Sequence, residues 1–487
     1  SVLHLRNARA VRRGMNVTSL IGHILELTEL TDRNSKPPDQ TASAFFRQKR
    51  YIGAADRRFI SEALYGMIRH RRFIEALLEE YVRRSPQDRA LDSPHLRYLA
   101  LFVAYAAADP GSRTAPGEVD RDLPFPHRID SLWSTYFPGG DLAAFVRWVR
   151  DHQRLDFLGE PELLSGDVPQ PARAAGGGVR RGTGSELLRL AVQYSFQDWM
   201  VRKWHDQFGA DTEKLLRSLN SPARITLRVN RSKTSREECR NRLLGEGIES
   251  VPTSFSDAGL VASKRFNVQA SQTFKDGWFE LQDEGSQFIS LIAHPQPGSI
   301  VLDACAGAGG KSLHLADLLK GEGRIFAVDI ELSRLDELDI RARRAGVTNI
   351  QALSAERLLP DEFAADLVLV DAPCSGVGTI RRNPGIKWRV TESLAAHYAS
   401  KQAHLLDASC RFVKQGGVLM YATCSLLREE NEDVVRSFLD AHAEFSVQRI
   451  DPQFCPPATI SAEGFATILP YSADTDGFFA AKFLRAG

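Results

Sequence analysis

The sequence lacks several features that would place it in a particular class of protein. It has no apolar run long enough to span a bilayer, and its first residues show no signal-peptide pattern. Cysteine is scarce, with six among 487 residues, and none forms a CxxC pair, which argues against a zinc site and a disulfide framework. We therefore expect a protein of the reducing cytoplasm, with no resident metal and no membrane association.

A large charge of one sign is also lacking, because the formal net charge is only +1. Such a balance does not by itself indicate a nucleic-acid partner. The cations, mostly Arg, come in short clusters, and a solvated face is the simplest interpretation of most of them. These clusters are Arg69 to Arg72, Arg180-Arg181, and Arg381-Arg382 with Lys387 and Arg389.

Changes in composition and periodicity divide the chain into four segments. Residues 1–155 carry apolar residues at helical spacing, and residues 156–186 collect Pro and Gly, which predicts a helical domain followed by a linker or exposed insertion. Residues 187–295 combine helical patterns with an alternating strand, which predicts a small α+β module. In residues 296–487 strands and helices alternate, which predicts a mostly parallel α/β sheet covered on both faces.

Five short apolar runs are the expected strands of this last segment. The best helix between them is expected from Leu394 to Val413, with Gly416-Gly417 as its C-terminal stop. Ligands bind at the carboxyl ends of parallel strands, which is where the chemically useful side chains fall. The strands are expected at residues 300–302, 325–328, 350–353, 367–370 and 418–422.

A glycine-rich turn follows the first of these strands. The strand ends at Asp303, and the turn leads into a helix from Ser312, as at the start of a nucleotide-binding sheet. The turn is not a P-loop, because Cys305 stands where that motif has its first glycine, and Ser312 breaks the dinucleotide fingerprint. Asp329 ends the second strand and suits a ribose diol, so S-adenosylmethionine and a dinucleotide both fit.

Two cysteines also stand at strand ends. Cys374 follows the run that ends at Asp371, and Cys424 follows the last expected strand. A free cysteine is most often a small buried hydrophobic residue, an interpretation that suits Cys239 and Cys410. Two thiols beside a cofactor turn, together with one carboxylate, instead indicate a nucleophile and an acid.

Several stretches of the chain resemble the Nop/Sun group of RNA cytosine-5 methyltransferases, in that family's order. The N-terminal part resembles the NusB-type RNA-binding domain of bacterial members that modify small-subunit ribosomal RNA. The resemblance implies a Rossmann-like S-adenosylmethionine-dependent sheet, preceded by an all-α NusB-like domain and the small α+β module. The matching stretches are Asp303–Ser312, Ala327–Asp329, Asp371–Arg389, Tyr421–Glu432 and Asp476–Phe483, with Ala55–Arg72 and Leu227–Asn230 before them.

The resemblance implies methyl transfer from S-adenosylmethionine to carbon-5 of a cytosine in RNA, with 16S ribosomal RNA as the expected substrate. Cys424 would add to carbon-6 of the base, and Asp371 would hold or protonate ring nitrogen-3. Cys374 would help to release the product. From its charge and position, Lys311 is expected to lower a thiol pKa or to position the base. We expect the chain to act as a monomer.

The resemblance also implies the cofactor contacts. Asp329 would bind the ribose, and Asp371 would lie near the methionine end. The family usually has an acid near the adenine, but this chain offers Ser354 or Glu356 there, and the choice stays open. The turn itself would contribute Cys305, Ala306, Gly307, Ala308, Gly309, Gly310 and Lys311.

The loop after Cys374 carries Arg381, Arg382, Lys387 and Arg389. We expect these cations to hold RNA phosphates, and we expect Trp388 to pack under the loop rather than to stack on a base. The target base must be unstacked to reach a thiol, so single-stranded or unfolded RNA is the expected form of the substrate.

Two rival functions stay open. A DNA cytosine-5 methyltransferase would use Cys374, which follows a proline as in that class, but it gives no reason for Cys424. A non-catalytic RNA-binding assembly factor would keep the sheet as a scaffold. The intact glycine turn, Asp371 and Cys424 argue against this second rival.

Overall fold

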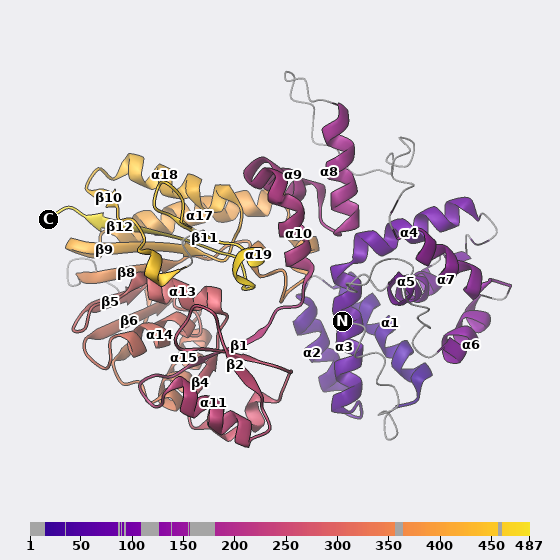
Figure 1. Ribbon diagram of the computed structural model, residues 1–487, viewed down its shortest axis with the longest axis horizontal. Coiled ribbons are helices and arrows are strands. Elements are labelled where there is room, and N and C mark those ends of the chain that lie inside the picture. The colour runs from indigo at the N-terminus through magenta and orange to yellow at the C-terminus, as the bar shows by residue number, and fades with distance from the viewer. Residues whose placement is uncertain are drawn as a thin grey trace. The chain divides into compact units, whose positions relative to one another are not determined.

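The chain forms two compact units in the computed structural model (Figure 1), Ser1–Ser221 with Lys387–Arg389, and Pro222–Ile386 with Val390–Gly487. The structure describes residues 15–34, 36–85, 88, 90–91, 94–108, 126–137, 139–153, 155, 181–355, 364–455 and 460–487. Residues 156–180 of the predicted linker and Glu356 lie outside these ranges. The predicted domain boundaries stay predictions; residues 187–221 of the predicted middle module fall in the first unit, and residues 222–295 fall in the second.

The first unit is built from helices whose apolar residues share a hydrophobic core. In α3, for example, Ala63, Leu64 and Met67 are almost fully buried on one side of the helix. Side-chain caps fix some helix starts, as where the Asn16 side chain accepts a hydrogen bond from the Thr18 N–H. The helices are α1 (Val17–Arg33), α2 (Pro38–Gln48), α3 (Ala54–Arg69), α4 (Arg71–Arg84), α5 (Pro94–Ala108), α6 (Pro126–Tyr136), α7 (Leu142–Asp151), α8 (Arg181–Gln193), α9 (Asp198–Phe208) and α10 (Thr212–Asn220).

A four-stranded antiparallel sheet opens the second unit, in the order β2-β3-β1-β4. Leu227, Val229 and Phe279 form its buried face, against which Cys239 of α11 packs. Cys239 is therefore the buried packing residue that the sequence predicted. The elements here are β1 (Ile225–Val229), α11 (Arg236–Gly245), β2 (Ser250–Pro252), β3 (Gly259–Ala262), α12 (Gln272–Lys275) and β4 (Phe279–Leu281).

The larger sheet has the order β10-β12-β9-β8-β5-β6-β7, with β11 beside β12. Strands β5 to β9 pair in parallel, whereas β12 runs antiparallel to β9. This is the predicted Rossmann-like sheet, and it contains all five expected strands. They are β5 (Ile300–Asp303), β6 (Arg324–Asp329), β7 (Ile350–Ser354), β8 (Ala365–Asp371) and β9 (Val413–Thr423), joined by β10 (Phe445–Val447), β11 (Ala466–Ile468) and β12 (Phe478–Arg485).

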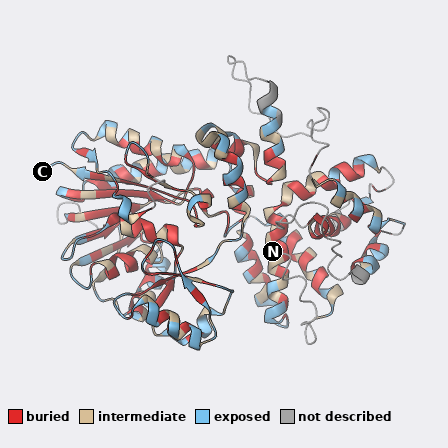
Figure 2. Ribbon diagram, in the orientation of Figure 1, coloured by how far each residue is buried: buried red, intermediate tan, exposed pale blue. Residues whose placement is uncertain are grey.

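Helices cover both faces of this sheet (Figure 1), and Figure 2 shows the strands as a largely buried layer. Successive residues of β9 alternate between the two cores: Leu419 and Tyr421 lie in the one that contains α17 and α18, and Met420 and Ala422 lie in the other. Because helices cover both faces of the sheet, a ligand can bind only at the ends of the strands. The helices are α13 (Glu284–Ala293), α14 (Gly310–Leu318), α15 (Leu332–Ala345), α16 (Ile386–Arg389), α17 (Glu392–Cys410), α18 (Glu432–Ala441) and α19 (Pro470–Ala473).

One predicted helix end is wrong. Helix α17 begins after its cap Thr391 and ends at Cys410, not at Val413. Gly416-Gly417 stops no helix, because both residues lie within β9, where the pairing with β8 shifts register and Gly416 has a φ of +70°. Glycine permits this irregular strand at a φ that other residues avoid.

None of the helices in the described ranges is both long enough and apolar enough to cross a bilayer.

Candidate active site

The carboxyl ends of neighbouring parallel strands bring the expected acidic residues to one edge of the sheet. Asp303 ends β5, Asp329 ends β6 and Asp371 ends β8. Ser354, the last residue of β7, lies opposite Asp329 in the β6–β7 pairing. Cys424 comes directly after β9, the parallel neighbour of β8. The sheet topology therefore gathers side chains that are more than one hundred residues apart in the sequence.

The two predicted thiols are in contact. Their Sγ atoms lie 3.2 Å apart, well beyond the ~2.05 Å of a disulfide bond, and both cysteines are free and partly exposed. The hydrogen bond with Cys424, together with burial, raises the pKa of the Cys374 thiol well above its ordinary value. Contact with Cys424 therefore opposes ionisation of Cys374.

An ion pair joins the next two predicted residues. Lys311 Nζ lies 2.5 Å from Asp371 Oδ2, and the ammonium group lies 5.5 Å from the centre of the Phe478 ring. Burial alone would lower the pKa of Lys311, but the Asp371 carboxylate more than offsets this and raises it. Cys424 contributes to the same rise, so the ammonium group also acts on this thiol.

The glycine turn takes the backbone conformation that its sequence predicts. Gly307 and Gly309 have φ values of +53° and +80°, and a Cβ atom at Gly309 would meet the Leu338 side chain at 2.5 Å. The Gly307 N–H donates to Asp329 Oδ2 (2.8 Å), and Oδ1 of Asp329 accepts from the Glu331 N–H (2.8 Å). The turn and the second acid are thus held together.

An adenosyl cofactor fits these residues. Asp329 is partly exposed, and each of its oxygens retains an acceptor site for a ribose hydroxyl. A Cβ atom at Gly307 would meet only the end of the Arg334 side chain, at 3.7 Å, so a ligand can approach the backbone closely there. Burial raises the pKa of Cys305 in the same turn, so this thiol is a poor nucleophile.

Two glycines, Gly378 and Gly477, form a chain of backbone hydrogen bonds that ends at the Cys424 carbonyl. The Gly378 N–H donates to the Cys424 carbonyl (3.0 Å), and the Gly477 N–H donates to the Gly378 carbonyl (2.9 Å). A Cβ atom at Gly378 would lie 2.8 Å from the Cys424 carbonyl oxygen. No role for these glycines or for Phe478 could be predicted from the sequence, although all of them lie in the stretches that resemble the family.

Family models match most of the chain outside its N-terminal part. The model described as "16S rRNA methyltransferase RsmB/F" matches residues 290–484, and the model of the RsmF/B-like ferredoxin-like domain matches residues 196–269. Probable ribosomal RNA small subunit methyltransferase B of Synechocystis sp. is 31% identical over 457 residues, which are 90% of this chain and 93% of the relative. The chain belongs to the RsmB/F family of 16S rRNA methyltransferases. The Nop/Sun resemblance predicted from the motifs is confirmed.

A second relative and a solved structure are also similar to this chain. Probable ribosomal RNA small subunit methyltransferase B of Bacillus subtilis is 34% identical over 312 residues, which are 62% of this chain and 69% of the relative. Among solved structures, that of the protein PH0851 is 27% identical, with a TM-score of 0.70 over 97% of this chain and 100% of its own. The similarity that shows the fold and the methyltransferase class therefore covers most of the chain.

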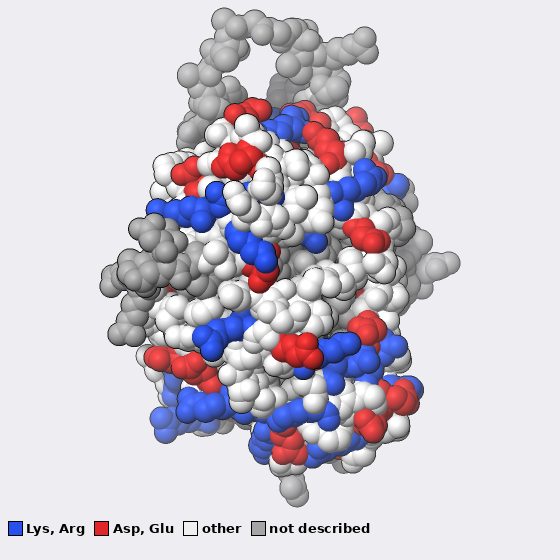
Figure 3. All heavy atoms as spheres, turned by 90° about the vertical axis from the view of Figure 1, so that its left-hand side faces the viewer, with Lys and Arg blue, Asp and Glu red and all other residues white. Residues whose placement is uncertain are grey.

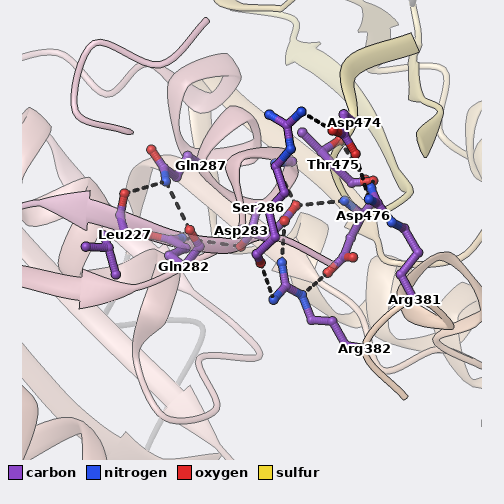
Figure 4. A network of polar contacts seen from close by, with 12 residues as sticks. Leu227, Gln282, Asp283, Ser286, Gln287, Arg381, Arg382, Asp474, Thr475 and Asp476 are labelled. Carbon is purple, nitrogen blue, oxygen red and sulfur yellow. Dashed lines mark hydrogen bonds and ion pairs between the residues drawn. The ribbon is translucent and has the colours of Figure 1, made fainter. Parts of the chain in front are cut away.

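The prediction that Arg381 holds an RNA phosphate is wrong, and Arg382 is already paired with two carboxylates. Arg381 is almost fully buried, donates to the Thr475 carbonyl (2.9 Å) and pairs with Asp474 (2.6 Å). Arg382 lies between Asp283 (2.5 Å) and Asp476, as Figure 4 shows. Burial and the neighbouring Asp283 raise the pKa of Asp476 to about 7. These guanidinium groups fasten the loop after Cys374 to the loop before β12.

Lys387 is also unavailable to phosphate. It belongs to the first unit, is fully buried, and donates to the carbonyls of Arg69 (2.9 Å), Tyr194 (3.1 Å) and Ser195 (3.0 Å). The prediction for Trp388 is confirmed, because its ring packs against the core of that unit and its Nε1 donates to the Ile68 carbonyl (2.7 Å).

The remaining charge is distributed as the balanced composition predicts. In the N-terminal cluster, Arg71 pairs with Asp32 and Glu75, and Arg72 pairs with Asp198. On the face of the molecule in Figure 3, Lys and Arg side chains are interspersed with Asp and Glu. Isolated pairs of this kind contribute little to stability at the surface.

Asp303 predicts a measurable pH dependence of stability. It is buried at the end of β5 and accepts from Ser312 Oγ (2.6 Å), and burial raises its pKa from 3.8 to about 6. The folded chain thus keeps a proton that the unfolded chain loses, so this residue lowers stability as the pH rises from about 4 to about 6. Chemical denaturation at pH of about 4 and about 6 measures the free energy of unfolding. Between these two values it should fall by about 2–3 kcal/mol more in wild type than in Asp303→Asn. An equal loss in the two proteins would contradict the assignment.

Proposed function

We propose that this family member transfers a methyl group from S-adenosylmethionine to carbon-5 of a cytosine in 16S ribosomal RNA, through a covalent bond between Cys424 and the base. The observation that carries the proposal is the 3.2 Å contact between the Cys424 and Cys374 sulfur atoms, beside the ion pair of Lys311 and Asp371. The choice of RNA rests on the family description and on the names of the relatives.

Cys424 is the proposed nucleophile. Carbon-5 of cytosine is too electron-poor to attack a methyl sulfonium, the electrophile that S-adenosylmethionine supplies when bound. The Cys424 thiolate therefore forms a bond to carbon-6, and the displaced electron pair makes carbon-5 nucleophilic. Cys424 suits this role because it is partly exposed at a strand end and interacts electrostatically with the Lys311 ammonium group.

Asp371 and Lys311 are assigned to the charge that builds up on the ring. Addition of sulfur to carbon-6 pushes electrons toward ring nitrogen-3, which needs a hydrogen bond or a proton. With Lys311 2.5 Å away, the Asp371 carboxyl group can pass a proton from the ammonium group to nitrogen-3. The proton returns by the same route when the sulfur–carbon bond breaks.

Cys374 is assigned to the release step. While Cys424 is a thiolate, it holds the pKa of Cys374 high, so Cys374 keeps its proton. In the adduct Cys424 is an uncharged thioether, and that opposition is gone. Cys374, which is partly exposed, can then lose its proton to water and take the proton from methylated carbon-5. The electrons of that carbon–hydrogen bond restore the ring double bond and expel Cys424 as a thiolate.

The residues of the turn are assigned to the cofactor. Asp329 binds the ribose hydroxyls through its remaining acceptor sites, and Gly307 lets the cofactor approach the backbone. The N-terminus of α14, which has Gly309 as its N-cap, faces the same turn with free backbone N–H groups. Ser354, opposite Asp329, is the described candidate for the adenine side.

Mapping the modified nucleotide tests this proposal. The full chain is incubated with S-adenosylmethionine labelled in the methyl group and with unmethylated 16S ribosomal RNA, and nucleoside mass spectrometry identifies the product. We expect 5-methylcytidine. A label on an exocyclic nitrogen or on a ribose oxygen, or no transfer at all, would contradict the proposal.

A further inference from the structure

Glu430 connects the two segments that carry the thiols. It ends the short 3₁₀ turn Arg428–Glu430, and its side chain is fully buried. Its carboxylate accepts hydrogen bonds from the Ser375 N–H (2.8 Å), from the Ser375 hydroxyl and from the Ser425 hydroxyl. These serines are the residues directly after Cys374 and Cys424, so one carboxylate binds the neighbours of both thiols.

Further contacts complete the arrangement around this carboxylate. The two serine oxygens lie 3.2 Å apart. The Gln402 side-chain amide donates both to Glu430 Oε1 (3.1 Å) and to the carbonyl of Pro373 (2.9 Å), the residue before Cys374. Cys374 is thus held through the residues on both sides of it.

The main chain of Glu430 is tied to the strand that leads to the second thiol. The Tyr421 hydroxyl, on β9, donates to the Glu430 carbonyl (2.6 Å). Asn431, the next residue, donates from its side-chain amide to the Ser425 carbonyl (3.1 Å) and accepts from the Thr423 hydroxyl (2.6 Å). The residues on both sides of Cys424 are therefore fixed by the Glu430-Asn431 turn.

Such a carboxylate is costly to bury. Burial raises the pKa of Glu430, and no Lys, Arg or His among the described residues forms a salt bridge with it. An ionised group without a cation is stabilised only by the hydrogen bonds that it accepts. An apolar side chain would fill the same space at a lower free-energy cost of burial. What the acid adds is a geometry that joins two particular loops.

We infer that Glu430 is a positioning residue for the reaction: its carboxylate clamps Ser375 to Ser425 and thereby sets the spacing and direction of the Cys374 and Cys424 thiols. This inference rests on the proposed function. Without the clamp the two turns can separate, and a displacement of about 1 Å in a reacting group costs about 100-fold in rate.

Kinetics of substituted chains give the first test. In Glu430→Ala the single-turnover rate of methyl transfer at saturating RNA and cofactor should fall about 100-fold, while KM for both changes less than about threefold. Glu430→Gln keeps an acceptor for the Ser375 N–H and should recover part of the rate. If Glu430→Ala does not fold, the double variant Ser375→Ala with Ser425→Ala removes both hydroxyl contacts of the clamp, leaves only the bond from the N–H of residue 375, and should also lose at least about tenfold in rate.

Glu246 offers a matched control. Its carboxylate accepts from the Ser271 hydroxyl (2.6 Å), the Thr273 hydroxyl (2.6 Å) and the Thr273 N–H (2.8 Å), nearly the same set of donors, but it lies at the small sheet. Glu246→Ala should lower the melting temperature and leave the single-turnover rate within about threefold of wild type. A loss of rate in this control equal to that in Glu430→Ala would overturn the inference, because destabilisation alone would explain both.

Capture of a trivalent arsenical tests the spacing without methyl transfer. Phenylarsine oxide bonds to two neighbouring thiols with loss of water, so wild type should bind one equivalent through Cys374 and Cys424. Glu430→Ala should bind it at least about tenfold more weakly. If wild type captures the arsenical but forms no 5-methylcytidine, the clamp stands and the proposed function fails. If Glu430→Ala matches wild type in capture and in rate, the clamp is wrong.

Discussion

Cys424→Ala should abolish methyl transfer, with a loss of at least about 10⁴-fold in rate. The substitution removes the atom that adds to carbon-6, and nothing else in the site lies at its position: the Cys374 sulfur is 3.2 Å away from it, and burial still opposes ionisation of Cys374 when Cys424 is absent. Incorporation of label from the methyl group into RNA measures the rate. Cofactor binding, measured by calorimetry, should persist because the glycine turn and Asp329 are untouched.

Cys410→Ala is the control for this experiment. Its sulfur packs in the core that contains α17, and its thiol donates to the Asp407 carbonyl (3.1 Å). Cys410 therefore takes no part in the site. This variant should keep its activity. Methyl transfer at the wild-type rate by Cys424→Ala would reject Cys424 as the nucleophile and favour the rival in which Cys374 attacks the base.

Cys374→Ala should accumulate a covalent complex of protein and RNA. Cys424 can still attack carbon-6, and carbon-5 can still be methylated, but the thiol that takes the carbon-5 proton is gone. The adduct therefore persists, and turnover should fall at least about 100-fold. A band of reduced mobility on a denaturing gel, which disappears on RNase treatment, measures the adduct.

The double variant Cys374→Ala with Cys424→Ala should form no adduct, because it lacks the attacking thiol. Adduct in this double variant would show that another residue bonds to the RNA. Normal turnover without adduct in Cys374→Ala would remove the release role of Cys374 and leave its high pKa without a function.

The fold of the catalytic part could be predicted because buried parallel strands are short apolar runs that end in polar residues. Val368 and Val370, for instance, lie in such a run, and Asp371 marks its end. The end of α17 could not be predicted in the same way. Gly416-Gly417 reads as a helix stop, but its conformation is decided by the pairing of β9 with β8, which is a tertiary contact.

The chemistry of the site could be predicted in part, because the thiols, the acids and the turn each lie in a local motif. Arg381 was misjudged because its partners, Asp474 and Thr475, lie more than ninety residues further along the chain. Glu430 was missed for a similar reason. Nothing in its local sequence indicates that its carboxylate meets Ser375, which is 55 residues away.

The most direct test of the account is to identify the residue that bonds to the base. The wild-type chain is incubated with S-adenosylmethionine and RNA that contains 5-fluorocytosine, whose fluorine cannot leave as the proton does, so the adduct is trapped. After digestion with protease and nuclease, mass spectrometry of the linked peptide should place the nucleotide on Cys424. A nucleotide on Cys374, or no linked peptide despite methyl transfer to unsubstituted RNA, would contradict the account.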